Sequence, residues 1–138
     1  MVMTALFNGK IMYSLIAKWT ILEGSEHKAW VALKELAKEV EKNEKDTWMY
    51  LVNKPNKKET SLPTPSHLEV TFHEVYKDKQ AFLDHVTGPI FTNFVAKYQD
   101  LFLTTTVTSA SGEKVTSPFV ICEFLEQEAG YIRKEIIH

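Results

Sequence analysis

The residues best suited to chemistry in this chain gather between positions 67 and 98. Glu74 and Tyr76 lie two residues apart in a segment of strand-like alternation, so they share one face of a predicted strand. His85 follows in the next predicted helix. An imidazole titrates near neutral pH, which makes His85 the first candidate for a general base or an orienting donor. Two other roles stay open for it: capping the helix end before Gly88, or packing as a hydrogen-bonded core histidine.

Other side chains could complete a substrate site around His85. Tyr76 could donate a hydrogen bond to a substrate oxygen, or fill the sheet edge as an aromatic residue. Glu74 is expected to orient another group or to pair with a lysine, rather than to act as the base. The remaining candidates for substrate contact are mostly aromatic, and core packing is the alternative for the two tryptophans: Trp19, Trp48, Tyr50, Asn53, Phe82 and Phe94.

The first half of the chain predicts a strand, a helix and a second strand. In the segment Tyr13 to Leu22, β-branched and aromatic residues alternate with others, as in a strand. One face of this strand would carry Tyr13, Leu15, Ala17, Trp19 and Ile21. Gly24 ends that strand, and Ser25 is a good helix N-cap because its hydroxyl can accept a free N–H of the first turn. Apolar residues then recur at helical spacing as far as Asn43. The segment Thr47 to Asn53 is apolar on both faces, which predicts a strand covered on both sides.

The second half begins with a long polar connection. Residues Lys54 to Ser66 include three prolines and very few apolar side chains, so we expect a surface loop that serves as a lid or binding loop. Leu68 to Tyr76 is predicted to be a strand. Asp78 can cap a short helix from Lys79 to Val86, and Gly88, followed by proline, separates it from an aromatic-rich helical segment.

Strand-forming sequence returns after position 100. We expect Leu101 to Thr108 to be the fourth strand and Val115 to Phe124 to be a further extended segment. The tail after Phe124 is predicted to be helical. These expectations divide the chain into an N-terminal arm (1–11), a domain (12–108) and an extension of strand plus tail (109–138). The extension would pack on the same domain or on a dimer partner.

The resulting order, β-α-β-β-α-β, predicts an α+β fold of the ferredoxin-like type. Both helices of this arrangement cover the same face of an antiparallel sheet. Neither face of the predicted sheet is polar, so we expect the second face to pack against another copy of the chain in a homodimer. The alternative is that the N-terminal arm and the C-terminal tail cover this face within one chain.

Composition excludes several classes of protein. With 138 residues the chain fits one domain, and 16 basic against 18 acidic residues give a charge of −2. This balance does not favour nucleic acid or an anionic membrane as a partner. There is no apolar run long enough to span a membrane and no convincing signal peptide. The single cysteine, Cys122, cannot form an internal disulfide, and we therefore expect a cytoplasmic protein.

The stretch from His67 to Tyr98 resembles the antibiotic biosynthesis monooxygenase (ABM) family. Members of that family show a strand that ends in Glu-x-aromatic, a short helix with an Ala-Phe/Leu-x-x-His pattern, a small-residue–Pro step and an aromatic-rich helix. The matching residues here are Glu74 and Tyr76, then Ala81, Phe82 and His85, then Gly88 and Pro89, then Phe91 and Phe94. The resemblance extends over Tyr13 to Thr106 and implies a dimeric α+β barrel with a pocket between sheet and helices, lined by His85.

The resemblance implies a cofactor-independent monooxygenase that uses O₂ on a small phenol or quinol. Such a reaction needs a base, a dry apolar pocket and a few directed hydrogen bonds, because the deprotonated substrate itself gives an electron to O₂. An isomerase or lyase that uses the same pocket, and a dimer that only binds a ligand, stay open as alternatives.

Cofactor chemistry has little support in the sequence. Haem-degrading relatives carry a Trp at the position of His85, an iron-binding His at that of Val95 and an Asn near that of Ala17. Three histidines, at positions 67, 73 and 85, match no standard zinc spacing. A Gly-rich phosphate loop, a nucleophile elbow and a dinucleotide-binding fingerprint are also absent. We therefore expect no metal and no bound cofactor.

Overall fold

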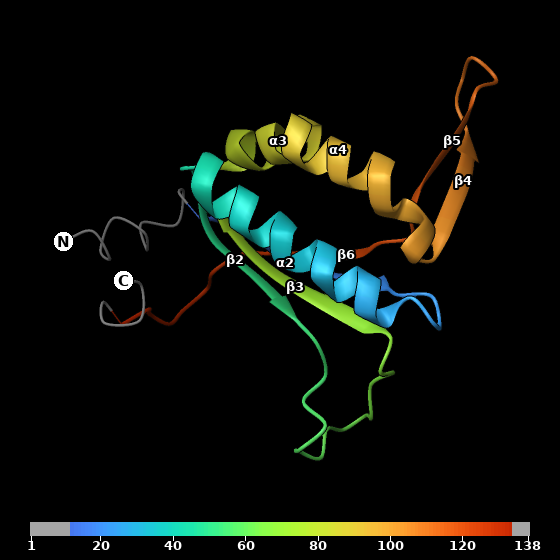
Figure 1. Ribbon diagram of the computed structural model, residues 1–138. Coiled ribbons are helices and arrows are strands. Elements are labelled where there is room, and N and C mark those ends of the chain that lie inside the picture. Colours follow the sequence, from blue (N-terminus) through green and yellow to red (C-terminus); the bar gives the residue numbers. More distant parts are fainter. Residues whose placement is uncertain (1–11, 134–138) are drawn as a thin grey trace.

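The computed structural model describes residues 12–133 and consists of a four-stranded antiparallel sheet with its helices on one face (Figure 1). The strand order is β2-β3-β1-β6, which confirms the predicted α+β, ferredoxin-like arrangement. The sheet and the helices that cover it consist of β1 (Tyr13–Thr20), α2 (Glu26–Asn43), β2 (Thr47–Asn53), β3 (Glu69–Tyr76), α3 (Lys79–Thr87), α4 (Pro89–Tyr98), the 3₁₀ helix η1 (Gln99–Leu101) and β6 (Ile121–Leu125).

The helix α2 begins and ends close to the predicted residues. Its buried side chains recur at helical spacing and pack on the sheet: Ala29, Ala32, Leu33, Leu36 and Val40. Ser25 occupies the N-cap position, but its side chain makes no capping hydrogen bond, contrary to the prediction. Instead, the Gly24 N–H donates to Glu26 Oε1 over 2.5 Å, and Gly24 turns the chain with a positive φ of 90°.

The break between α3 and α4 is confirmed and has a steric cause. Asp78 caps α3 by accepting the Ala81 N–H over 2.9 Å. Gly88 then ends α3, and Pro89 occupies the first turn of α4. A Cβ atom on Gly88 would lie 2.6 Å from the carbonyl oxygen of Asp84, so only glycine fits this close approach. The sharp turn lets α3 and α4 both lie over β3 and β1.

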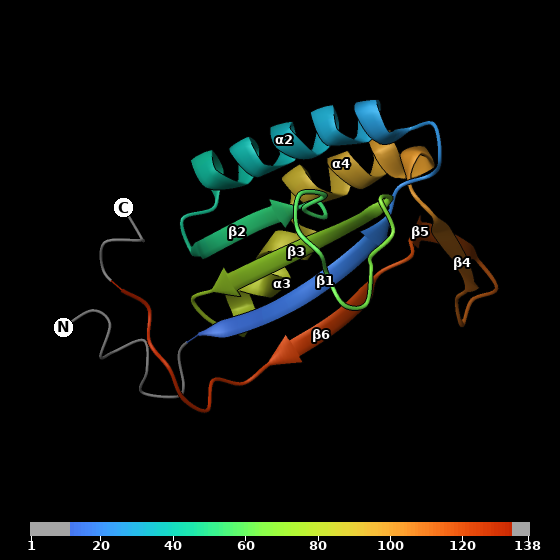
Figure 2. The same cartoon turned by 90° about the horizontal axis from the view of Figure 1, so that it is seen from below.

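The two faces of the sheet differ in polarity more than the sequence suggested. The helix-covered face takes the large aromatic residues, and Leu15, Trp19 and Phe72 are all buried there. The opposite face is seen from below in Figure 2. It presents apolar Met49, Leu51 and other aliphatic side chains, but its pairing register also places these polar residues on it: Ser14, Lys18, Asn53, Glu69, Thr71, His73 and Glu123. The expectation that neither face is polar was therefore wrong for the open face.

The fourth strand of the sheet is not the predicted one. β6 pairs with β1 through the register Leu15 to Phe124 and Ala17 to Cys122. Of the predicted strand at Leu101 to Thr108, the start pairs briefly with the end of β1 through a bridge between Ile21 and Phe102. The rest forms β4 (Thr104–Thr108), which pairs only with β5 (Lys114–Pro118). Every residue of β4 is exposed. This Thr-rich segment has strand propensity but no apolar face to place on a core, so it forms a separate hairpin.

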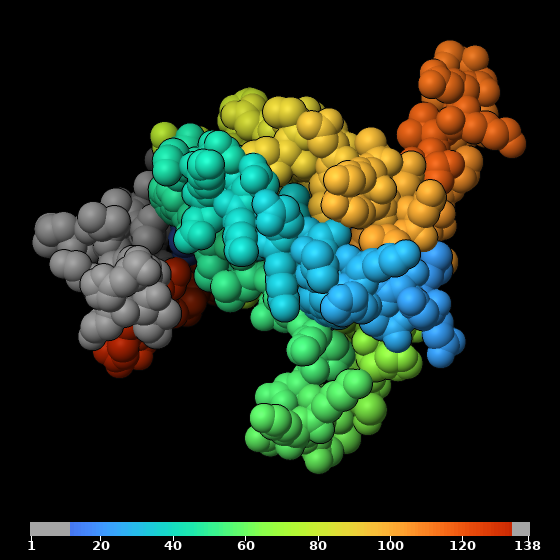
Figure 3. Space-filling model, viewed as in Figure 1, coloured from blue at the N-terminus to red at the C-terminus, as the bar shows by residue number. Residues whose placement is uncertain are grey.

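Two segments project from the body of the molecule. The β4–β5 hairpin stands away from the helices, and the connection 54–68 extends from the opposite side (Figure 3). Residues 126–133 contain no helix, so the helical prediction for the tail was wrong over this range. The predicted N-terminal arm (1–11) and the end of the tail (134–138) lie outside the described residues.

Candidate active site

His85 lies on the inner face of α3, pressed against the sheet. Only 2% of its surface is exposed. Its Nδ1 atom lies 2.7 Å from Oε1 of Glu44. Glu44 follows the last residue of α2, where the chain turns into β2, and its Oε1 also accepts the hydroxyl of Thr47 over 3.0 Å. Glu44 and His85, which are 41 residues apart in the sequence, thus form one polar contact.

Sequence reasoning missed Glu44. It lies in the hydrophilic stretch KNEKD at the end of a helix, where acidic residues are usually solvated. No local pattern separates it from its charged neighbours, because its partner comes from a distant helix. The carboxylate orients the imidazole in the way that second partners orient histidines at metal and catalytic sites.

The Glu44 contact determines which nitrogen of His85 can act as a base. A carboxylate only accepts hydrogen bonds, so Nδ1 carries the proton and donates it to Glu44. Nε2 of the neutral ring is then the free acceptor, and no described residue forms a hydrogen bond with it. Burial lowers the pKa of His85 below its ordinary value, while the charge and hydrogen bond of Glu44 act in the opposite direction. The neutral, basic form is therefore favoured near pH 7.

Glu74 and Tyr76 form a second polar pair beside His85. The Tyr76 hydroxyl donates to Glu74 Oε1 over 2.5 Å, and both side chains are buried. Burial raises the pKa of Glu74 to about 7, with a smaller rise from Glu44, while the Tyr76 hydrogen bond lowers it. Burial also raises the pKa of Tyr76 far above its ordinary value, so its hydroxyl remains a donor. Glu74 is consequently a carboxyl group that can exchange a proton near neutral pH.

Aromatic rings surround the imidazole. The ring centroids of Tyr50, Phe91 and Tyr76 lie 5.2, 5.2 and 5.7 Å from that of His85. Burial, together with the charges of Glu74 and Glu44, raises the pKa of Tyr50, so this hydroxyl also stays protonated. We call the set His85, Glu44, Glu74, Tyr76 and Tyr50 the His85 cluster. It combines a base, an acid with a near-neutral pKa and two phenol donors in an apolar setting.

The structure brings only some of the predicted site residues together. Tyr50, Glu74, Tyr76 and His85 meet, and the Phe82 ring lies 5.5 Å from that of Tyr76. The others lie elsewhere. Trp19 and Phe94 are buried in the aromatic core, Trp48 is 41% exposed, and Asn53 donates to the carbonyl oxygen of Thr71 at the end of β2.

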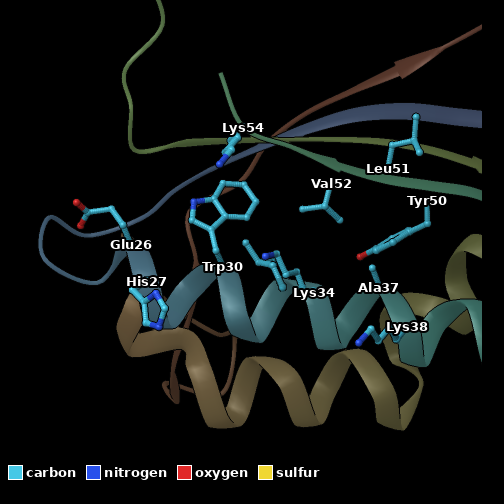
Figure 4. Close-up of a pocket in the computed structure, with 11 residues that line it drawn as sticks. Glu26, His27, Trp30, Lys34, Ala37, Lys38, Tyr50, Leu51, Val52 and Lys54 are labelled. Atoms are coloured by element: carbon cyan, nitrogen blue, oxygen red, sulfur yellow. The ribbon is translucent and has the colours of Figure 1, made fainter. Parts of the chain in front are cut away.

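A groove of about 680 Å³ runs between α2 and the edge strand β2 (Figure 4). Tyr50 lines it, and the ring of the same residue contacts His85, so the groove adjoins the His85 cluster through this side chain. Within residues 12–133, no group of three or more His, Cys, Asp or Glu side chains could hold a metal ion. None of the helices in that range is long and apolar enough to cross a membrane.

Comparison with known proteins identifies the fold. No protein-family model matches the sequence, and no curated protein matches it. Solved structures do match. A putative antibiotic biosynthesis monooxygenase from Caulobacter crescentus CB15 is 15% identical with a TM-score of 0.64, and the match covers 88% of this chain and 93% of that one.

Two proteins from Bacteroides thetaiotaomicron VPI-5482 have a similar structure. One is described as a putative antibiotic biosynthesis monooxygenase (14% identity, TM-score 0.59, covering 86% of this chain and 89% of that one). The other is a conserved protein described as a possible oxidoreductase (17% identity, TM-score 0.60, covering 86% and 99%). The resemblance to the ABM family is thus confirmed at the level of the fold.

Proposed function

We propose that the protein is a cofactor-independent monooxygenase of the ABM type that acts on a small phenol or quinol, with His85 as the general base. The observation that carries the proposal is the 2.7 Å contact between Glu44 and the buried His85, whose ring lies among aromatic side chains. A solvated surface histidine would have neither the fixed tautomer nor the dry surroundings that this chemistry needs. The fold shared with structures described as antibiotic biosynthesis monooxygenases supports the same reaction class.

In this proposal, Nε2 of His85 removes the proton of the substrate hydroxyl group. Glu44 stabilises the imidazolium that forms, since the carboxylate already accepts the Nδ1 proton. The electron-rich substrate anion then reduces O₂ at a carbon atom that carries hydrogen. One oxygen atom enters the ring as a carbonyl group and the other leaves as water with two substrate hydrogens, and the substrate ring supplies all four electrons as it becomes a quinone.

The pair Glu74–Tyr76 has a supporting role in this scheme. Glu74 holds the Tyr76 hydroxyl in place, and its pKa of about 7 allows it to take up or release a proton during turnover. We assign the base to His85 because Nε2 of its neutral ring has no partner among the described residues, whereas Glu74, with a pKa of about 7, is partly protonated and already accepts the Tyr76 hydroxyl.

Oxygen uptake by the purified protein against a panel of hydroquinones and polycyclic phenols tests this function. We expect protein-dependent uptake that falls at least about 100-fold in His85→Ala, the size usual for loss of a general base. His73→Ala is the matched control, because His73 lies on the open face of the sheet. Substrate conversion without oxygen uptake would instead identify an isomerase or lyase, and ligand binding without any conversion would identify a binding protein.

We also propose that the chain acts as a homodimer through the open face of the sheet. Leu51 on one edge strand of this face, and Ile121 and Leu125 on the other, are 48%, 59% and 39% exposed, and a second copy packed on the sheet would bury them. Light scattering during size-exclusion chromatography measures the mass directly. Leu51→Lys should yield a monomer, whereas Val31→Lys, on the outer side of α2, should leave the dimer intact. A wild-type monomer would refute the proposal.

A further inference from the structure

The groove between α2 and β2 has an apolar floor. Trp30, Leu33 and Ala37 of α2 face Tyr50 and Val52 of β2 across it. Figure 4 shows the indole of Trp30 and the ring of Tyr50 extending into the space between helix and strand. No described residue forms a hydrogen bond with the Tyr50 hydroxyl, whose raised pKa keeps it a donor. A flat aromatic molecule fits between such walls better than a sugar or a peptide does.

The rim of the groove is basic. Lys34 and Lys38 lie one turn apart on α2, and Lys54 follows the end of β2. A second hollow of about 560 Å³ continues from the groove through Trp30 and Lys54 and adds Lys57 and Lys58. The two hollows together are lined by five lysines and two histidines, with Glu26 as the single acidic residue, in a protein whose net charge is −2. The charge here is thus opposite to that of the whole protein.

We propose that this groove is a binding site for a small aromatic molecule that carries an acidic group, a carboxylate or a sulfonate. The aromatic part lies against Trp30 and Tyr50, and the anion lies at the rim beside Lys34 and Lys38. The lysine ammonium groups are flexible and solvated, so they attract an anion without requiring one fixed geometry. Binding does not depend on the proposed oxygenase activity, although a ligand here contacts Tyr50, whose ring touches His85.

Two fluorescent probes with the same aromatic frame test the site: 1-anilinonaphthalene-8-sulfonate, which is an anion, and N-phenyl-1-naphthylamine, which is neutral. Lys34→Gln/Lys38→Gln should weaken binding of the anionic probe about fivefold to tenfold and leave the neutral probe unchanged. Lys28→Gln/Lys42→Gln is the matched control, with the same change of charge on the same helix outside the groove. Trp30→Ala should weaken binding of both probes.

Three results would overturn the proposal. The first is an equal loss of affinity for the anionic probe in the two double variants, which would mean that only the net charge of the protein affects binding. The second is an equal loss of affinity for both probes in Lys34→Gln/Lys38→Gln, which would indicate a disturbed fold. The third is undiminished binding of both probes in Trp30→Ala, which would place them elsewhere, such as on the open sheet face. His85→Ala should retain the anionic probe, so failure of the oxygenase proposal is distinguishable from failure of this one.

Discussion

The His85 cluster and the α2–β2 groove share one residue, Tyr50, yet they use charge in opposite ways. In the cluster, the polar groups are inside and hydrogen-bond one another: His85 with Glu44, and Tyr76 with Glu74. In the groove, the inside is apolar and the charged groups, such as Lys34, lie at the exposed rim. Buried polar groups must have fixed partners because their desolvation is costly, whereas exposed ammonium groups keep their water.

This difference separates what each region can contribute. Fixed partners in a dry setting shift pKa values and hold one tautomer, which is what proton transfer requires. Solvated charges at a rim act at longer range and select ligands by charge, with energies that salt reduces. We therefore expect substitutions in the cluster to have large, pH-dependent effects, and changes at the groove to have small, salt-dependent ones.

The largest expected effect concerns the pH dependence of stability. Glu74 has a pKa of about 7 in the folded protein against an ordinary 4.5, so folding becomes less favourable as the pH rises between these values. Glu74→Gln removes this titration and keeps an acceptor for Tyr76. Its free energy of unfolding, relative to wild type, should rise by about 3 kcal/mol from pH 4.5 to pH 7. Urea unfolding at both pH values measures this, and a pH-independent difference would contradict it.

The next effect concerns the orientation of His85. Glu44→Gln should lower kcat/KM about 10-fold to 100-fold, since the neutral amide neither fixes the same tautomer nor stabilises the imidazolium. Because Glu44 raises the pKa of His85, the acidic limb of the pH–rate profile should also move to lower pH in this variant. Glu41→Gln, on the exposed part of α2, is the control. An unchanged acidic limb would show that His85 does not titrate in the reaction.

A third comparison concerns the helices that carry the two regions. Asp78 caps α3, which carries His85, while Ser25 makes no side-chain capping bond to α2, which lines the groove. Asp78→Ala should lower the free energy of unfolding by about 1 kcal/mol, and Ser25→Ala by clearly less. Thermal unfolding of both variants measures the contrast, and equal losses would refute it.

The smallest effect is that of salt. Raising the ionic strength from about 0.01 M to about 0.15 M shortens the screening length from roughly 30 Å to 8 Å. The affinity of an anionic aromatic probe should fall several-fold, while kcat/KM for a neutral phenol should stay constant, because His85 and Glu74 are buried. A parallel fall of both quantities would mean that the two regions do not differ as described.

Sequence patterns predicted the elements that depend on near neighbours. The alternation in β1 and β3, the Asp78 cap and the Gly88 break each reflect contacts within a few residues, so they could be read locally. The opposite orientation of Glu74 and His73 follows from the same alternation and is confirmed by the register. The shared strand face of Glu74 and Tyr76, and the choice of His85 on the next helix, are the parts of the candidate site that the sequence supplied.

Long-range pairing decided the rest. Segments 104–108 and 121–125 both have strand-forming sequences, but only 121–125 lies beside β1, where Phe124 packs against Tyr13. Glu44 became part of the candidate site because the end of α2 lies against α3, a contact that no local pattern encodes. The sequence by itself therefore determined the elements and the faces of their strands, since these follow from short-range sterics and periodicity. Only the tertiary structure decided which distant charges lose their water together, and that loss of water creates both the paired cluster and the pKa shifts within it.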